Sequence, residues 1–380
     1  MCIIRNILLF FIVFGEYGGI FMKTFTINLE LYNNNFSGKY KMQISSRNNT
    51  LNKKILKDAP IDIRCPLEIL LHGYQEKSMG MDMLWAGTAM GDGWITKWTE
   101  KIKDGLLQKT CNNVLIVHWD KYAKGDFQKI IKSNLRNIKT HFSRYHSFTT
   151  NECGALTNEW RNHQMLYLQE YNKVIDNARK IAKFLGKFLS YLPKLKRFNI
   201  KDIRIRGFSL GAHLAGFIGK EINMKTGKKV GRITGLDPTG PLFYSLSADN
   251  RLDKGDALFT DVIHTNGALF GIYEPIGHAN FYPNNGCGMK EKSRISDFKR
   301  MDIIGELLTS TYSHYKATQY FFESIDSDEF LSTPCDSYKN FEEGKCNGNQ
   351  VFMGYNVNTT LASGNYYLDI KDDKEPDFGL

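Results

Sequence analysis

The 380-residue sequence lacks any apolar run long enough to hold a chain in a membrane, since its longest candidate covers only residues 7–14 and a spanning helix needs about 20 residues. It also lacks internal repeats, low-complexity linkers and a clear break in composition. Hydrophobic residues make up 42% of the chain and charged residues 24%, as in folded proteins. A disordered or fibrous chain is therefore excluded, and a single domain is the simplest prediction.

The N-terminal apolar run is typical of a secretory signal. Arg5 precedes it, and the small residues Gly15, Gly18 and Gly19 follow it. We therefore predict a signal peptide over residues 1–19, a secreted protein, and one domain over residues 20–380. A buried N-terminal strand is the alternative.

Once Cys2 is removed with the signal, an even number of cysteines remains: Cys65, Cys111, Cys153, Cys287, Cys335 and Cys346. A secreted chain with this count can form disulfides, although the residues alone do not fix the pairs. Asn35, Asn48 and Asn358 each begin a sequon for N-glycosylation, which agrees with secretion but adds little.

Short apolar segments alternate with amphipathic ones along the chain. A helix is predicted over residues 166–192, and strands are predicted over residues 67–71, 114–117, 203–206, 230–234 and 261–264. Strands that alternate with helices favour an α/β fold, with a mostly parallel central sheet flanked by helices.

Residues 120–165 interrupt this alternation and predict a large surface insertion. Within it, residues 121–144 carry seven basic residues against one acidic residue, Asp126, so this run could hold more than half of the net charge of +10. A basic amphipathic helix can lie on an anionic membrane; an ordinary solvated helix is the alternative. Nucleic-acid binding is not predicted, because no basic-aromatic motif accompanies the charge.

The strongest local motif is GFSLG, residues 207–211, which lies between a strand-like and a helix-like segment. Such a turn exposes its central serine, here Ser209, at the end of a sheet. The glycines provide the room that the sharp turn requires.

A serine hydroxyl needs a base to remove its proton and a carboxylate to orient that base. On this type of fold the acid and then the histidine follow the serine in the chain. Asp237 follows a predicted strand, with a turn residue as its alternative role. The histidine candidates are His213, His264, His278 and His314; position favours His314, which precedes a helical run.

An oxyanion hole needs two backbone N–H groups. The residue after the serine, Leu210, supplies one. The second is expected from the loop that follows the strand at residues 67–71, where Tyr74 comes after a His-Gly pair.

Several ordered blocks together resemble the animal pancreatic-lipase family, particularly its single-domain insect-type lipases and phospholipases A1. They cover about residues 25–370: ILLHGY, VLIVHW, RGFSLGAHLAGFIGK, ITGLDPTGPLF, RLDKGDALFTDVIHTNGALFG, PIGHANFYPNNGCG, SHYKATQYFFESI and PCDSYKNFEEGKC. The resemblance implies an α/β-hydrolase fold, a lipid ester hydrolase, the triad Ser209, Asp237 and His314, and oxyanion donors at Tyr74 and Leu210.

The resemblance also implies a lid over residues 288–311 and a disulfide between Cys335 and Cys346. Tyr312 stands where the second cysteine of the lid is expected, so the usual lid disulfide with Cys287 is not predicted. A pair between Cys65 and Cys111 is a further hypothesis.

No cofactor is required by this interpretation. Asp253 and Asp256 resemble a calcium loop that some relatives have, with a solvated loop as the alternative. The resemblance leads us to expect no β-sandwich domain and no colipase-type partner.

The predicted function is hydrolysis of neutral lipids at a lipid-water interface through an acyl-enzyme on Ser209. Phospholipase A1 activity is the alternative within this class, because the lid and the connection before it point to different substrates. A non-catalytic lipid-binding or yolk-type storage protein is the alternative of another class.

Overall fold

The structure is a computed structural model that describes residues 24–36, 38–74, 94–124, 165–244, 246–267, 270–288 and 302–371. Side chains are not described for residues 94–97, 165–170 and 302–311. The predicted signal peptide, most of the predicted insertion and the first half of the predicted lid lie outside these ranges. None of the described helices is both long and apolar enough to cross a membrane.

The described residues build one sheet of 11 strands in the order β10-β9-β11-β8-β7-β6-β5-β3-β4-β1-β2. Its central strands are parallel: β3 (Leu67–Leu71), β4 (Asn113–His118), β5 (Ile203–Phe208), β6 (Val230–Leu236), β7 (Ala257–Ile263) and β8 (Ala279–Pro283). The α/β class and the parallel sheet are thus confirmed.

Strands at the two edges complete the sheet. On one side the hairpin β1 (Thr26–Asn33) and β2 (Tyr40–Ser45) joins β4 in antiparallel pairing. On the other side β11 (Gly364–Leu368) pairs in parallel with β8, and β9 (Leu331–Pro334) and β10 (Val351–Phe352) continue antiparallel. A short helix, α11 (Tyr338–Glu342), lies in this last part of the chain.

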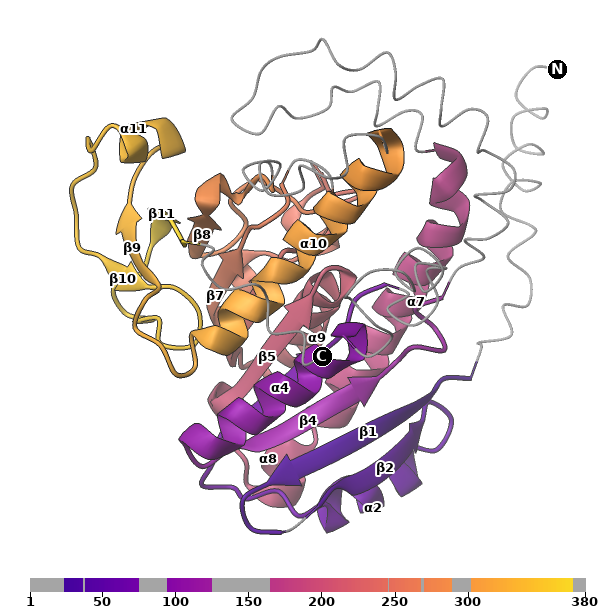
Figure 1. Ribbon diagram of the computed structural model, residues 1–380. Helices are drawn as coiled ribbons and strands as arrows, with labels where there is room; N and C mark the ends of the chain where they lie inside the picture. Colours follow the sequence, from indigo (N-terminus) through magenta and orange to yellow (C-terminus); the bar gives the residue numbers. More distant parts are fainter. Residues whose placement is uncertain are drawn as a thin grey trace, which may run out of the picture.

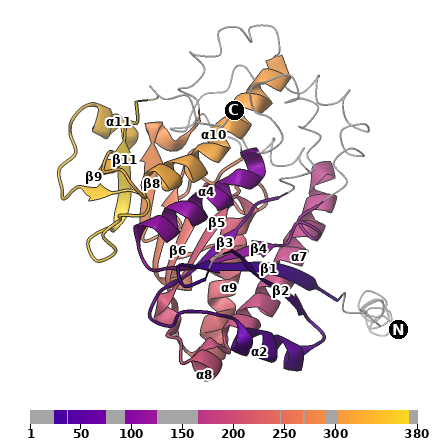
Figure 2. The ribbon, with the colours of Figure 1, turned by 60° about the horizontal axis from the view of Figure 1, so that its bottom comes forward.

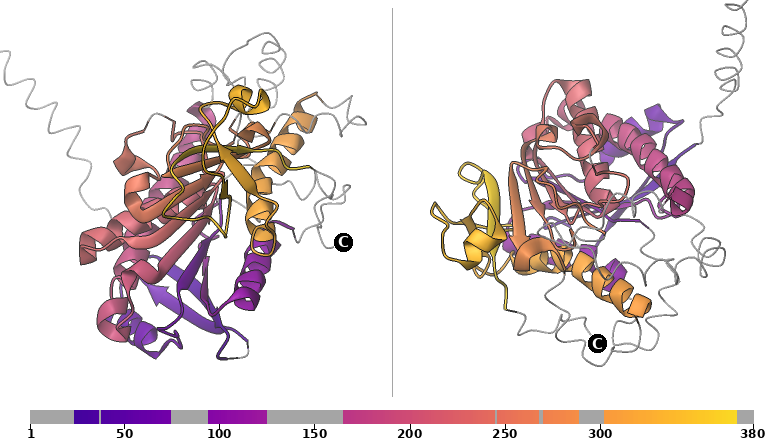
Figure 3. Two further views of the ribbon diagram at one scale, coloured as in Figure 1. Left: turned by 90° about the vertical axis from the view of Figure 1, so that its left-hand side faces the viewer. Right: turned by 90° about the horizontal axis from the view of Figure 1, so that it is seen from above.

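Helices cover both faces of the sheet (Figures 1 and 3). One face carries α7 (Met165–Leu189) and α9 (Leu210–Thr226), which pack on each other, and the other carries α4 (Trp94–Lys109) and α10 (Asp302–Glu323). Each face has its own hydrophobic core. Two further helices, α2 (Asn49–Asp58) and α8 (Leu192–Lys196), lie together at the end where β5 begins (Figure 2).

Two described disulfides agree with the pairs expected from the sequence. Cys335 bonds to Cys346, and Cys65 bonds to Cys111, joining the approaches to β3 and β4. Cys287 is also disulfide-bonded, whereas Tyr312 occupies the position of the expected lid cysteine.

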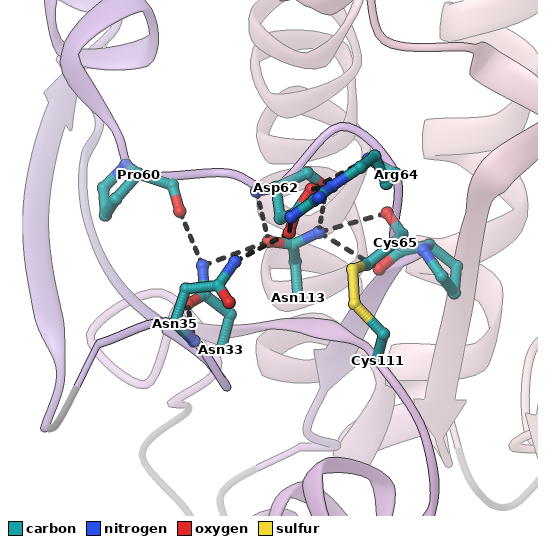
Figure 4. A network of polar contacts seen from close by, with 9 residues as sticks. Asn33, Asn35, Pro60, Asp62, Arg64, Cys65, Cys111 and Asn113 are labelled. Atoms are coloured by element: carbon teal, nitrogen blue, oxygen red, sulfur yellow. Dashed lines mark hydrogen bonds and ion pairs between the residues drawn. A yellow bond between two sulfur atoms is a disulfide. The ribbon is translucent and has the colours of Figure 1, made fainter.

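A polar network surrounds the Cys65–Cys111 bond (Figure 4). The side-chain amide of Asn113 donates to the carbonyl oxygens of Asp62 and Cys65, at 2.8 and 3.1 Å, and its oxygen accepts from the N–H of Asp62. Among the described residues, the group formed by Asp62 and these two cysteines has its ligand atoms close enough for a metal ion. The disulfide consumes both thiolates, so the group is a structural brace and not a metal site.

A buried ion pair joins two of the central strands. Glu68 on β3 and Arg206 on β5 are both fully buried, and their side chains meet at 2.8 Å. The guanidinium of Arg206 also lies over the ring of Phe321 on α10, 5.1 Å from its centroid. Burial lowers the pKa of Arg206 to about 10, so the group stays charged and requires its partner.

Candidate active site

Ser209 occupies a sharp turn between β5 and α9. Its backbone has φ 56° and ψ −123°, a combination that residues other than glycine rarely adopt. A Cβ at Gly207 would overlap the backbone of Gly211, and a Cβ at Gly211 would overlap the carbonyl oxygen of Leu71. Both glycines of the motif are therefore required by close backbone contacts, and the serine is held at the carboxyl end of the parallel strands.

Asp237 directly follows β6, the neighbouring strand. It is fully buried with φ 42°. One carboxylate oxygen accepts from the backbone N–H groups of Thr265 and Asn266, at 2.8 and 3.1 Å, and the other bonds to Nδ1 of His314 at 2.5 Å. These bonds satisfy the buried carboxylate and aim it at the imidazole.

His314 lies inside α10, not on a loop before a helix as its position in the sequence predicted. Its ring packs against Phe208, 4.6 Å away between centroids, and against Phe270 at 5.7 Å. One helix, which begins at Asp302, therefore contains both the second half of the predicted lid and His314. A helix fixes the ring more firmly than a loop would.

The predicted triad comes from three elements: Ser209 follows β5, Asp237 follows β6 and His314 lies in α10. The N–H of Ser209 donates to the carbonyl oxygen of Leu236 at 3.0 Å, and Leu236 precedes Asp237. Phe208, which precedes Ser209, contacts His314. The serine therefore lies beside the hydrogen-bonded Asp237–His314 pair.

The loop after β3 runs directly along the serine. A Cβ at Gly73 would lie 2.9 Å from Cβ of Ser209, closer than real side chains approach. The next residue, Tyr74, packs edge to face on Tyr171, with 5.0 Å between ring centroids. This contact holds the loop that carries Tyr74, one of the two predicted oxyanion donors. The other predicted donor, Leu210, is the first residue of α9.

His213 is part of the core. Its Nδ1 accepts from the N–H of Leu252 at 3.0 Å, and its Nε2–H donates to the carbonyl oxygen of Thr239 at 2.9 Å. The ring stacks on Phe243 at 3.7 Å. Burial lowers the pKa of His213 to about 3, so this residue is a neutral packing group.

The two remaining histidine candidates also have structural partners. His264 is buried and stacks on Tyr282, and its Nδ1 lies 2.7 Å from the carbonyl oxygen of Ile272. The Nδ1 of His278 accepts from the N–H of Thr260 at 3.0 Å. Of the four candidates, His314 bonds to Asp237.

The carboxylates of both predicted calcium residues, Asp253 and Asp256, bond to other groups of the protein. The Asp253 side chain accepts from the N–H of Gly255, and Asp256 accepts from the N–H of Asp253. Asp256 also pairs with the ammonium group of Lys220. Since Lys220 already supplies the positive charge, this geometry favours a reciprocal helix cap over a calcium loop.

Two features of the site were not predicted. The turn after β7 supplies the amides of Thr265 and Asn266, and Gly271 lies so close to Asp237 that a Cβ there would overlap the carboxylate. The sequence signal for the first was the Thr-Asn-Gly turn after an apolar strand. Nothing in the sequence indicated the approach of Gly271, because 34 positions separate it from Asp237.

The strand order, the serine turn and the Asp–His pair define a protein of the α/β-hydrolase class. A family model for lipases matches residues 150–375, so the chain belongs to the lipase family. It is 33% identical to human pancreatic lipase-related protein 2, over 52% of this chain and 43% of that protein. It is 35% identical to rat lipase member H, over 52% and 41%, and 36% identical to rabbit hepatic triacylglycerol lipase, over 47% and 37%. The chain thus spans less than half the length of these relatives.

Proposed function

We propose that this protein is a secreted lipid esterase that forms an acyl-enzyme on Ser209. The observation that carries the proposal is the hydrogen bond between Asp237 and Nδ1 of His314, directly beside the strained serine turn. Membership of the lipase family supports the same conclusion.

His314 acts as the general base. Because Nδ1–H donates to Asp237, Nε2 is the atom that accepts the proton of the serine hydroxyl. The Ser209 oxygen attacks the ester carbonyl carbon, and the intermediate releases the alcohol, which takes the proton from Nε2. Water then attacks the acyl group by the same steps, giving the fatty acid and free serine.

The backbone N–H groups of Tyr74 and Leu210 stabilise the negative oxygen of both intermediates. Leu210 begins α9, whose first amides favour negative charge. Gly73 brings the loop against the serine, and the Tyr74–Tyr171 contact holds it there before substrate binds. No metal ion or organic cofactor is needed for this chemistry.

The test is hydrolysis of a short p-nitrophenyl ester by purified protein. We expect Ser209→Ala and His314→Ala to lower kcat by about a thousandfold or more. Ser190→Ala is the matched control, since Ser190 directly follows α7 and its hydroxyl donates to the carbonyl oxygen of Lys187. Turnover by Ser209→Ala equal to that of the control would reject the mechanism.

Among lipids, we propose neutral acylglycerols as the preferred substrates. The match to a triacylglycerol lipase supports this choice. Fatty-acid release from emulsified triolein should exceed release from phosphatidylcholine vesicles, and calcium should not alter either rate. The opposite preference would indicate a phospholipase A1. Secretion is tested by expressing the chain with and without residues 1–19 and assaying cells and medium.

A further inference from the structure

Tyr171 lies between two parts of the proposed active site that are far apart in the sequence. It belongs to α7, and its ring is half-buried against the core on that face of the sheet. The ring contacts Tyr74 in the loop after β3, and the hydroxyl reaches Thr239, two positions after Asp237. The proposed mechanism uses the ring contact, whereas the hydroxyl bond has no part in it so far.

The hydroxyl bond fixes the outer end of the Tyr171 ring. The hydroxyl donates to Oγ1 of Thr239 at 3.1 Å. Burial raises the pKa of Tyr171 above its ordinary value, so the hydroxyl keeps its proton and remains a donor. A tyrosine side chain has only two torsions between its backbone and its ring. The ring is therefore held at both ends, by the backbone of α7 and by this bond.

Thr239 is a firm anchor because its backbone is held on several sides. Its carbonyl oxygen accepts from the buried His213 at 2.9 Å, and it pairs with Gly271 as an isolated antiparallel bridge. The residues before and after Thr239 bond to the same stretch, residues 270–272. Gly271 in turn lies against the carboxylate of Asp237. The hydroxyl bond thus ends on the segment that sets the acid of the predicted triad.

The other end of this connection is the loop that carries a proposed oxyanion donor. Tyr74 packs edge to face on Tyr171, with 5.0 Å between the ring centroids, and the preceding Gly73 lies directly against Ser209. A group that acts in catalysis must lie within about 0.5 Å of its productive position. A ring that could turn on α7 would leave the loop with more than one position, and the held ring leaves it with one.

We propose that Tyr171 is a positioning residue of the esterase: its bond to Thr239 fixes the ring on which the oxyanion loop packs and thereby aims the N–H of Tyr74. This inference rests on the proposed function and adds a link between the oxyanion loop and the segment of the acid. The donor meets a full negative charge in the tetrahedral intermediate and only a carbonyl dipole in the bound ester. Loss of the link should therefore lower kcat and leave KM nearly unchanged.

The test compares variants that lose one hydroxyl, assayed with a soluble p-nitrophenyl ester. Tyr171→Phe keeps the ring and removes the donor, and Thr239→Val keeps the side-chain shape and removes the acceptor. We expect each to lower kcat about tenfold and to change KM by less than about twofold. Thr239→Ser keeps the hydroxyl and should turn over nearly as wild type.

Tyr191→Phe is the matched control for the loss of a tyrosine hydroxyl. Tyr191 follows the other end of α7, and its hydroxyl donates to Oδ1 of Asn49 at 3.2 Å. Its kcat should equal that of wild type. The double variant Tyr171→Phe with Thr239→Val should be no slower than either single variant, because both substitutions remove the same bond. Losses that multiply would show two separate effects and would overturn the proposal.

A second measurement separates positioning from a general loss of structure. When phenylboronic acid binds, the Ser209 oxygen adds to boron, the serine proton passes to Nε2 of His314, and a hydroxyl of the tetrahedral adduct takes the place of the oxyanion. Inhibition should weaken in Tyr171→Phe by the same factor as kcat falls. The pH profile of kcat/KM should keep its midpoint on the acid side, because the base and its partner are untouched. Unchanged inhibition or a shifted midpoint would place the effect outside the oxyanion loop and overturn the proposal.

These outcomes are distinct from a failure of the esterase mechanism itself. If the wild type hydrolyses no ester, both the function and the role of Tyr171 are rejected. If Ser209→Ala is inactive while Tyr171→Phe retains full kcat, only the role of Tyr171 is rejected. A fall in kcat that Tyr191→Phe reproduces would reject that role as well.

Discussion

Gly271 lies directly against the carboxylate of Asp237, in the space that any larger side chain would need. This approach keeps the carboxylate aligned with both its backbone donors and His314. The Asp237–His314 pair therefore depends on a residue that has no chemistry of its own.

Gly271→Ala should lower esterase kcat about tenfold or more, because the methyl group displaces the Asp237 carboxylate from His314. KM should change little, since the substituted residue lies behind the carboxylate. The kinetics are measured with a soluble ester. Gly255→Ala is the control, because a Cβ there would approach only the Oδ1 of Asp253, at 3.1 Å; equal effects in both variants would contradict the prediction.

Glu68→Gln should destabilise the fold by about 3 kcal/mol or more, because it leaves the fully buried Arg206 without a countercharge. Urea unfolding measures the free energy. Arg64→Ala removes the ion pair between the exposed guanidinium of Arg64 and Asp62 and should destabilise the fold far less. Comparable losses would show that the buried pair contributes no more than the surface pair.

The His213 interaction should weaken in acid. The pKa of the buried imidazole is about 3, against about 6.5 in an unfolded chain. The unfolded state therefore takes up a proton first, and stability from this residue is present above pH 6.5 and is lost as the pH falls towards 3. His213→Gln should be destabilised at pH 7.5, and the difference from wild type in urea midpoint should shrink at pH 5. A constant difference would exclude this linkage.

The two described disulfides should differ in their contribution to stability. The Cys65–Cys111 bond spans 46 residues and the Cys335–Cys346 bond spans 11, which the chain-entropy model converts to about 4 and about 3 kcal/mol. Thermal unfolding of the two double-alanine variants measures the difference. A larger loss for the shorter loop would show that native-state packing outweighs loop entropy there.

The regular elements were predictable because they depend on local patterns. The apolar runs at residues 67–71 and 114–117 became β3 and β4, and the amphipathic stretch at residues 166–192 became α7. The helical position of His314 was missed, because its neighbours in the sequence are polar. They become buried only when α10 packs on the sheet. The Arg206–Glu68 pair was also invisible, since a charged residue inside a strand gives no sign of its partner.

The sequence by itself determined the fold class and the serine turn, because strand periodicity and the spacing of Gly207 and Gly211 are local properties of the chain. It also marked Asp237 and His314 as candidates. Only the tertiary structure decided that they bond to each other, since the carboxyl ends of separate strands meet only when the sheet forms.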